Sequence, residues 1–205
     1  DYNSQLTEAR DLALVLRAGA LPVELEFQEQ RVVGPSLGAD AIDKAELAAA
    51  IGSALVFLAM IWYYRVSGVY ASITLLVNVL MVMTALVLLG ATLTVPGIAG
   101  IALTVGMAAD GNIIIYERIK EELNKGIGPK EAVNIAFNKA FWTILDANIT
   151  SALAGLCLLN FGIGVVSGFA VTLLIGLTTT VYTSYFMTKL LFDWHVSKPR
   201  QTLSI

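Results

Sequence analysis

Two aspartates, Asp110 and Asp146, stand inside long apolar stretches of this sequence, and each is followed two positions later by an asparagine, Asn112 or Asn148. An ionised carboxylate in a bilayer costs roughly 2.5–3.5 kcal/mol on insertion scales, and removal from water favours the neutral acid. A carboxyl group that alternates between these two forms is what a proton carrier requires. The asparagine amides could relay or satisfy its hydrogen bonds. We therefore predict a proton relay made of these four residues, with Asp110 buried near its centre.

The roles of the two aspartates are not predicted equally well. Asp110 lies about 10 Å and Asp146 about 8 Å inside the same membrane boundary, at ~1.5 Å per helical residue. The two carboxyl groups could thus sit at similar depth. Asp146 is nearer the boundary, so a helix-packing hydrogen bond or a solvated helix end remains an alternative for it. No Lys or Arg lies deep in an apolar stretch, so a permanent cationic partner for Asp110 must come from another chain or segment.

The sequence offers little other chemistry. The single cysteine, Cys157, lies in an apolar run, and the single histidine, His195, follows the last such run. Neither belongs to a metal-ligand or disulfide pattern. No basic patch with interleaved aromatic residues is present, which argues against nucleic-acid binding. We expect no enzymatic reaction, no metal and no cofactor other than protons as the coupling ion.

The composition predicts an integral membrane protein. Of 205 residues, 57% are hydrophobic and 14% are charged, and the mean hydropathy is +0.74. Five apolar stretches each approach the ~20 residues that cross a bilayer core. They cover residues 45–64, 69–90, 95–116, 141–162 and 167–192. The predicted fold is therefore an all-α transmembrane bundle of five helices.

Basic residues predict how the bundle is oriented. If the five spans alternate in direction, nine Lys and Arg residues fall on one side, which the positive-inside rule makes cytoplasmic. That side contains the loop 117–140 and the C-terminus, and residues 1–42 lie outside. Within the loop, Pro129 can begin a short helix along the membrane surface. The basic residues of this side are Arg65, Arg118, Lys120, Lys125, Lys130, Lys139, Lys189, Lys198 and Arg200.

The N-terminal residues predict a short α+β stub outside the membrane. Residues 5–19 have the apolar spacing of an amphipathic helix, and residues 22–33 alternate as a half-buried strand does. We expect residues 1–42 to end an extracytoplasmic domain and residues 43–205 to form the transmembrane domain. Because the sequence starts at Asp1 without a signal-type segment, we expect further spans upstream.

The stretch that carries Asp110 is rich in residues that break or tighten a helix. Small residues let helices approach closely, and they also lower the cost of local unwinding beside a functional group. Both roles, packing and hinge, remain open. The residues are Pro96, Gly97, Gly100, Gly106 and Gly111.

Five long motifs make the chain resemble the SecD family, the larger half of the SecDF accessory translocase. They are LRAGALP (16–22), VGPSLGADAI (33–42), GATLTVPGIAGIALTVGMAADGNIIIYERIKEEL (90–123), FWTILDANIT (141–150) and GFAVTLLIGL (168–177). The resemblance covers essentially the whole chain. It places the family's key carboxylate at Asp110 and its second Asp-Ala-Asn motif at Asp146–Asn148. Gly111 stands where many family members have alanine.

The resemblance implies a function that composition cannot supply. A SecD-like chain would be half of a transporter of the resistance-nodulation-division (RND) type, in the bacterial inner (cytoplasmic) membrane. It would use the proton-motive force to assist late steps of protein export. The implied partners are SecF, which would supply the other half-bundle, the SecYEG translocon, the exported preprotein and the lipid bilayer.

Three other functions can be weighed against this one. An RND-type antiporter of protons against small molecules or lipids would use the same Asp110. An intramembrane aspartyl protease would pair two aspartates, but it carries Gly-x-Gly-Asp, and this chain has Gly106-Met-Ala-Ala-Asp110. In a purely structural scaffold, Asp110 would only pack.

Overall fold

The computed structural model describes residues 6, 9–10, 13–14, 35–162 and 165–196. The chain divides into two units, Asp1–Pro35 and Ser36–Ile205. Most of the predicted stub, including the strand 22–33, lies outside the described residues. The second unit begins before the predicted boundary at residue 42, because residues 36–42 already belong to its first helix.

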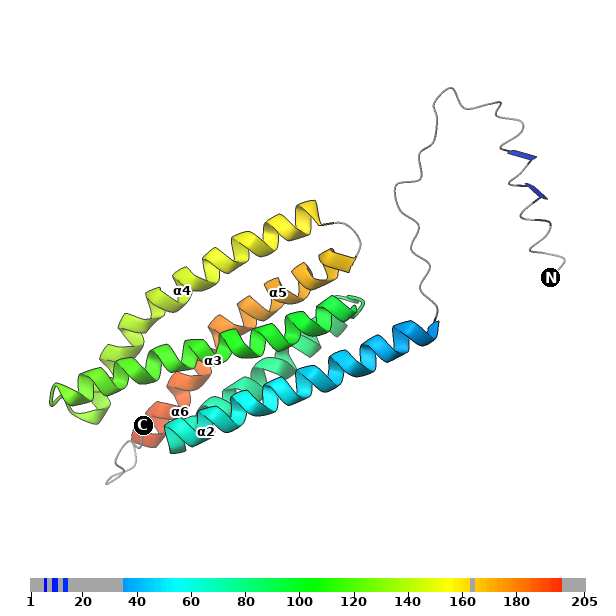
Figure 1. The fold of residues 1–205 in the computed structure, drawn as a ribbon. Helices are drawn as coiled ribbons and strands as arrows, with labels where there is room; N and C mark the ends of the chain where they lie inside the picture. The colour runs from blue at the N-terminus through cyan, green and yellow to red at the C-terminus, as the bar shows by residue number, and fades with distance from the viewer. Residues whose placement is uncertain (1–5, 7–8, 11–12, 15–34, 163–164, 197–205) are drawn as a thin grey trace. The chain divides into compact units, whose positions relative to one another are not determined.

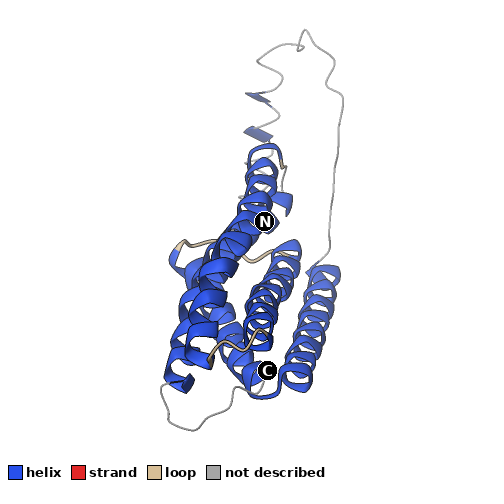
Figure 2. Cartoon of the chain, turned by 90° about the vertical axis from the view of Figure 1, so that its left-hand side faces the viewer, coloured by secondary structure: helices blue, strands red, loops and turns tan. Residues whose placement is uncertain are grey.

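All the secondary structure in the described part of the second unit is helical. Its elements are α2 (Pro35–Leu88), α3 (Val95–Asn124), α4 (Pro129–Phe161), α5 (Val165–Tyr182), the π-helix η1 (Thr183–Met187) and α6 (Thr188–Val196). Figure 1 shows α3, α4 and α5 running alongside one another, and Figure 2 shows the same helices from the side. Four helices in the described part are long and apolar enough to cross a membrane: Gly38–Leu88, Val95–Asn124, Pro129–Phe161 and Val166–Val196.

The helix α2 reverses direction at Arg65. This residue has φ 49° and ψ −114°, which is not a helical conformation. In a straight helix Gly68 would lie about 12 Å along the axis from Met60, yet a Cβ on Gly68 would clash with the carbonyl oxygen of Met60. The chain therefore folds back, and residues 35–64 and 66–88 are two arms of a hairpin (Figure 1). The predicted joint between the first two apolar stretches lies at this turn.

Helix α3 begins where the sequence supplies start signals. The hydroxyl of Thr94 accepts a hydrogen bond from the backbone N–H of Gly97 at 3.2 Å, and Pro96 occupies the first turn, where a missing N–H costs nothing. At the other end, Gly126 adopts φ 82°, a left-handed conformation that suits glycine after a helix.

The helix predicted to begin at Pro129 within the loop 117–140 is not short, as expected, but part of a longer one. Helix α3 continues to Asn124, and α4 does begin at Pro129 but then runs without interruption to Phe161. The reason is burial: the apolar face that begins at Val133 packs against the bundle and is excluded from water. Four residues of this face are at most 1% exposed, namely Val133, Ala136, Phe137 and Ala140.

This end of the bundle is held by aromatic rings. Tyr116 of α3 packs against Tyr64 at 5.2 Å and against Phe192 of α6 at 5.3 Å between ring centroids. Phe137 of α4 contacts Phe192 at 6.2 Å. The tilted and edge-to-face arrangements are the favoured ones for aromatic pairs. The cluster fixes one end of α3, and thereby the face that α3 presents at Asp110.

Candidate functional site

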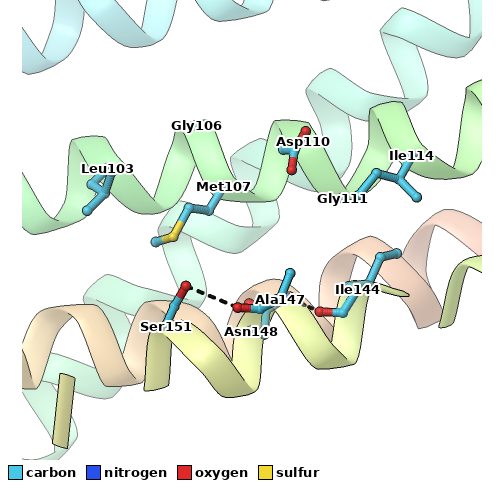
Figure 3. A pocket seen from close by; sticks show the side chains of 10 residues that line it. All are labelled: Leu103, Gly106, Met107, Asp110, Gly111, Ile114, Ile144, Ala147, Asn148 and Ser151. Atoms are coloured by element: carbon cyan, nitrogen blue, oxygen red, sulfur yellow. Dashed lines mark hydrogen bonds between the residues drawn. The ribbon is translucent and has the colours of Figure 1, made fainter. Parts of the chain in front are cut away.

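A groove of about 280 Å³ lies between α3 and α4, and Asp110 lines it. Figure 3 shows Asp110 on the α3 wall, with Asn148 and Ser151 on the α4 wall. Both α4 side chains donate to carbonyls of their own helix: Asn148 to Ile144 at 2.7 Å and Ser151 to Ala147 at 3.1 Å. The groove is lined by Leu103, Gly106, Met107, Asp110, Gly111, Ile114, Ile144, Ala147, Asn148 and Ser151.

The prediction that Asp110 is buried is wrong for this chain, because its side chain is exposed. Leu103, Gly106 and Asp110 follow one another at helical spacing along a ridge of α3 that is exposed and forms one wall of the groove. The buried positions of α3 lie on its other side and include Ala108 and Asn112. The carboxyl group of Asp110 therefore faces away from the interior of the bundle and lies at the groove.

Asn112 lies on the opposite side of α3 from Asp110. Two residues correspond to about 200° around an α-helix, which turns Asn112 into the interior, where it is 1% exposed. Its amide nitrogen donates to the Thr74 hydroxyl at 3.2 Å, and its carbonyl oxygen accepts from the Thr188 hydroxyl at 2.8 Å. Asn112 thus joins α2, α3 and α6. Its predicted part in a proton relay stays a prediction, and the described contacts do not link it to Asp110.

Asp146 is not among the residues that line the groove. Its side chain is exposed on α4, whereas Asn148, two residues later, lies on the groove wall. The structure thus brings Asp110 and Asn148 to one groove and leaves Asp146 outside it. This arrangement gives no support to an acid–base pair of aspartates of the kind that an aspartyl protease needs.

The predicted glycines divide into two groups. A Cβ on Gly100 would lie 3.2 Å from the Thr172 side chain, and one on Gly111 would lie 2.9 Å from the Ser184 hydroxyl. Gly97 similarly faces Thr172. These three glycines bring α3 close to α5 and η1, as small residues do in membrane helices. Gly106 has nothing within 4 Å of a Cβ and instead leaves space in the groove beside Asp110.

Sequence reasoning missed a line of buried polar side chains inside the bundle, which we call the polar seam. A signal was present: hydroxyl residues recur between positions 178 and 188 of the last apolar stretch. The seam comprises Thr74, Asn78, Asn112, Thr179, Thr180, Thr183, Ser184 and Thr188, each at most 7% exposed.

The charged residues cluster beyond the groove, at the end of α3. Glu122 is buried and pairs with Lys139 of α4 at 2.8 Å and with Lys125 at 3.2 Å. Hydrogen bonds from Lys125 to the carboxylates of Glu121 and Glu122 raise the pKa of this lysine. The residues that line the groove include no Lys or Arg. In the part of the chain that the structure describes, no group of three His, Cys, Asp or Glu residues could hold a metal ion.

Comparison with known proteins then identifies the family. The model of the family described as "Protein export membrane protein SecD/SecF, C-terminal" matches residues 17–198. The chain belongs to this family. The protein translocase subunit SecD of Syntrophobacter fumaroxidans is 53% identical over 199 residues, which are 97% of this chain and 37% of that protein. The SecD subunit of Desulfurispirillum indicum is 48% identical over 98% of this chain and 39% of its own length.

Solved SecDF structures share the fold. The crystal structure of SecDF from Thermus thermophilus, described as a translocon-associated membrane protein, matches with a TM-score of 0.78 and 43% identity. The match covers 96% of this chain and 28% of the SecDF chain. The chain therefore spans well under half the length of these SecD and SecDF relatives. Family membership and four apolar helices together make it a membrane protein.

Proposed function

We propose that this chain is the membrane portion of a SecD-type subunit that uses the proton-motive force to assist late steps of protein export. Family membership supports the protein-export class. In this proposal α2 crosses the membrane twice, once with each arm, which gives five crossings. The Lys- and Arg-rich end lies in the cytoplasm of a bacterial cell, and residues 1–42 lie on the opposite side.

The observation that carries the proposed mechanism is the exposure of Asp110 on a groove without a cation. An outward-facing carboxyl group in an apolar helix is costly unless a second surface or water covers it. We assign that surface to the half-bundle of SecF, which would supply any intramembrane cation. The match to SecDF supports this assignment. The present chain corresponds to only 28% of the SecDF chain, so that protein has further segments that could supply the covering surface.

Protonation of Asp110 would act as the switch. The ionised form needs water or a cation at the interface of the two halves, whereas the neutral form tolerates apolar contact, so each form favours a different packing. One elementary charge moving across 100 mV supplies about 2.3 kcal/mol. Alternation between the packings would move the extracytoplasmic domain, which would pull on a preprotein as it leaves the SecYEG channel.

The test is Asp110→Asn in the full-length protein together with SecF and SecYEG in inverted membrane vesicles. Both proton uptake and the gain in completed translocation on energising the membrane are measured. We expect both to be lost. Asp146→Asn, a matched change outside the groove, should retain them. If the Asp110→Asn protein, present at normal levels, still showed the full gain in translocation, the proposal would be refuted. If only Asp146→Asn abolished the gain, Asp146 on α4 would be the proton carrier instead.

A further inference from the structure

The polar seam contains a buried acceptor that none of the described residues satisfies. Asn78 is 0% exposed, and its amide nitrogen, which has two hydrogens to donate, lies 3.1, 3.2 and 3.3 Å from the hydroxyl oxygens of Thr183, Thr179 and Thr180. Its carbonyl oxygen, Oδ1, has no hydrogen-bond partner among the described residues. Buried amide oxygens are nearly always paired with protein or water. Oδ1 of Asn78 therefore indicates a bound donor other than the described residues.

The seam continues from Asn78 along the interior side of α3. The Thr188 hydroxyl contacts both the backbone carbonyl of Thr183 at 3.3 Å and Asn112 at 2.8 Å. Asn112 then reaches Thr74 at 3.2 Å, one helical turn from Asn78 on α2. Because Asn112 and Asp110 point to opposite sides of α3, this seam is separate from the groove at Asp110.

The chemistry of the seam selects a neutral ligand. Its side chains are hydroxyls and amides, without a carboxylate or a basic group, so a formal charge would have no counter-charge there. A buried water typically makes two to four hydrogen bonds and needs that number of polar partners. Here it would donate to Asn78 Oδ1 and exchange hydrogen bonds with the Thr180 and Thr183 hydroxyls, which are at most 1% exposed.

The backbone beside this site is also irregular. The π-helix η1 begins at Thr183, and single π-turns within α-helices are frequently found at functional sites. Gly111 on α3 permits close approach of Ser184, the next residue of η1.

We propose that the polar seam is an internal water site, in which water bound between Asn78, Thr180 and Thr183 exchanges with the aqueous phase. The site is distinct from the Asp110 groove and does not depend on the function proposed above. Water at this position lets η1 exchange hydrogen bonds with α2 without leaving buried groups unpaired. It also places exchangeable protons on the side of α3 opposite the carboxyl group.

Solid-state NMR on the unmodified full-length protein in lipid vesicles tests the site directly. Polarisation is transferred from water to the Asn78 side-chain amide and, as a control, to the methyl group of Ala136, which is also 0% exposed but lies in the apolar cluster. We expect transfer to Asn78 to be several-fold faster than transfer to Ala136. Equal, slow transfer at both positions would overturn the proposal.

Thiol accessibility provides a second test. Thr180→Cys and Ala136→Cys are each made with Cys157→Ala, because Cys157 is exposed and would react on its own. A small membrane-permeant maleimide should label the cysteine at position 180 and not the one at position 136. Labelling at neither position, together with slow NMR transfer, would show that the seam is dry. If Thr180→Cys does not fold, the NMR measurement on the native protein decides.

Discussion

Asn112 and Asn148 occupy equivalent places in the sequence, two residues after an aspartate, but the structure predicts that replacing them has different consequences. Asn112 makes two hydrogen bonds to other helices, with Thr74 and Thr188. Asn148 makes one, to the carbonyl of Ile144 in its own helix. Only the first set holds helices together, so only Asn112→Ala should weaken the packing of the bundle.

The magnitudes follow from measurements on other membrane helices. An interhelical hydrogen bond contributes about 0.6 kcal/mol on average and up to about 1.7 kcal/mol, so the two bonds of Asn112 are worth roughly 1–3 kcal/mol. Asn148→Ala removes a local bond at a half-buried position, and we expect a change within about 0.5 kcal/mol. The free energy of unfolding is measured for the full-length variants in mixed detergent micelles by titration with a denaturing detergent.

A double-mutant cycle sharpens this test. Thr188→Ala combined with Asn112→Ala should cost less than the sum of the single changes, by about 0.6–1.7 kcal/mol. If Asn148→Ala destabilised the protein as much as Asn112→Ala, or if the cycle showed no coupling, the interior placement of Asn112 would be refuted.

Three further predictions concern the contacts around α3. Gly111→Val should destabilise the protein by about 1–3 kcal/mol through overpacking against Ser184, and Ser184→Gly in the same chain should recover most of the loss in an unfolding titration. Glu122→Gln should lower the unfolding midpoint more than Glu121→Gln, since the Glu122 side chain is 3% exposed and that of Glu121 47%; equal effects would contradict the buried ion pair. Because the pKa of Lys125 is raised, the stabilising contribution of its ammonium group is complete below the ordinary lysine pKa. That contribution is lost as the pH rises through the raised pKa. An NMR titration of the Lys125 ammonium group should detect the raised pKa, and Glu121→Gln, the control, should bring it closer to the ordinary value.

Local signals in the sequence correctly predicted where helices begin and turn. The start at Pro129 and the joint near Arg65 are confirmed, because proline, glycine and charged residues act through the backbone of their immediate neighbours. The helix that begins at Pro129 is longer than the predicted short one, because its length depends on packing against the distant Tyr116 and Phe192. The residues next to Pro129 in the sequence do not reveal these distant packing partners.

The exposure of Asp110 could not be read from the sequence for a different physical reason. Leu103 is 46% exposed and Ile115 is 0% exposed, although both lie on α3 and are equally apolar. Lipid tails are as apolar as a protein interior, so apolar residues occupy both faces of a membrane helix. Hydropathy therefore identified the helix and its aspartate but could not tell the inner face from the outer one. The same ambiguity hid the polar seam.

The tight reversal at Arg65 also bears on how the protein is made. Because Gly68 lies against the carbonyl of Met60, the two arms of α2 share a turn with no spare chain, and neither arm can reach its place while the other is held elsewhere. In the five-crossing arrangement proposed above, we therefore expect the pair to enter the bilayer during synthesis as one cooperative insertion unit. Lengthening the turn with a flexible insert after Arg65 would uncouple the arms and allow the first one to integrate alone.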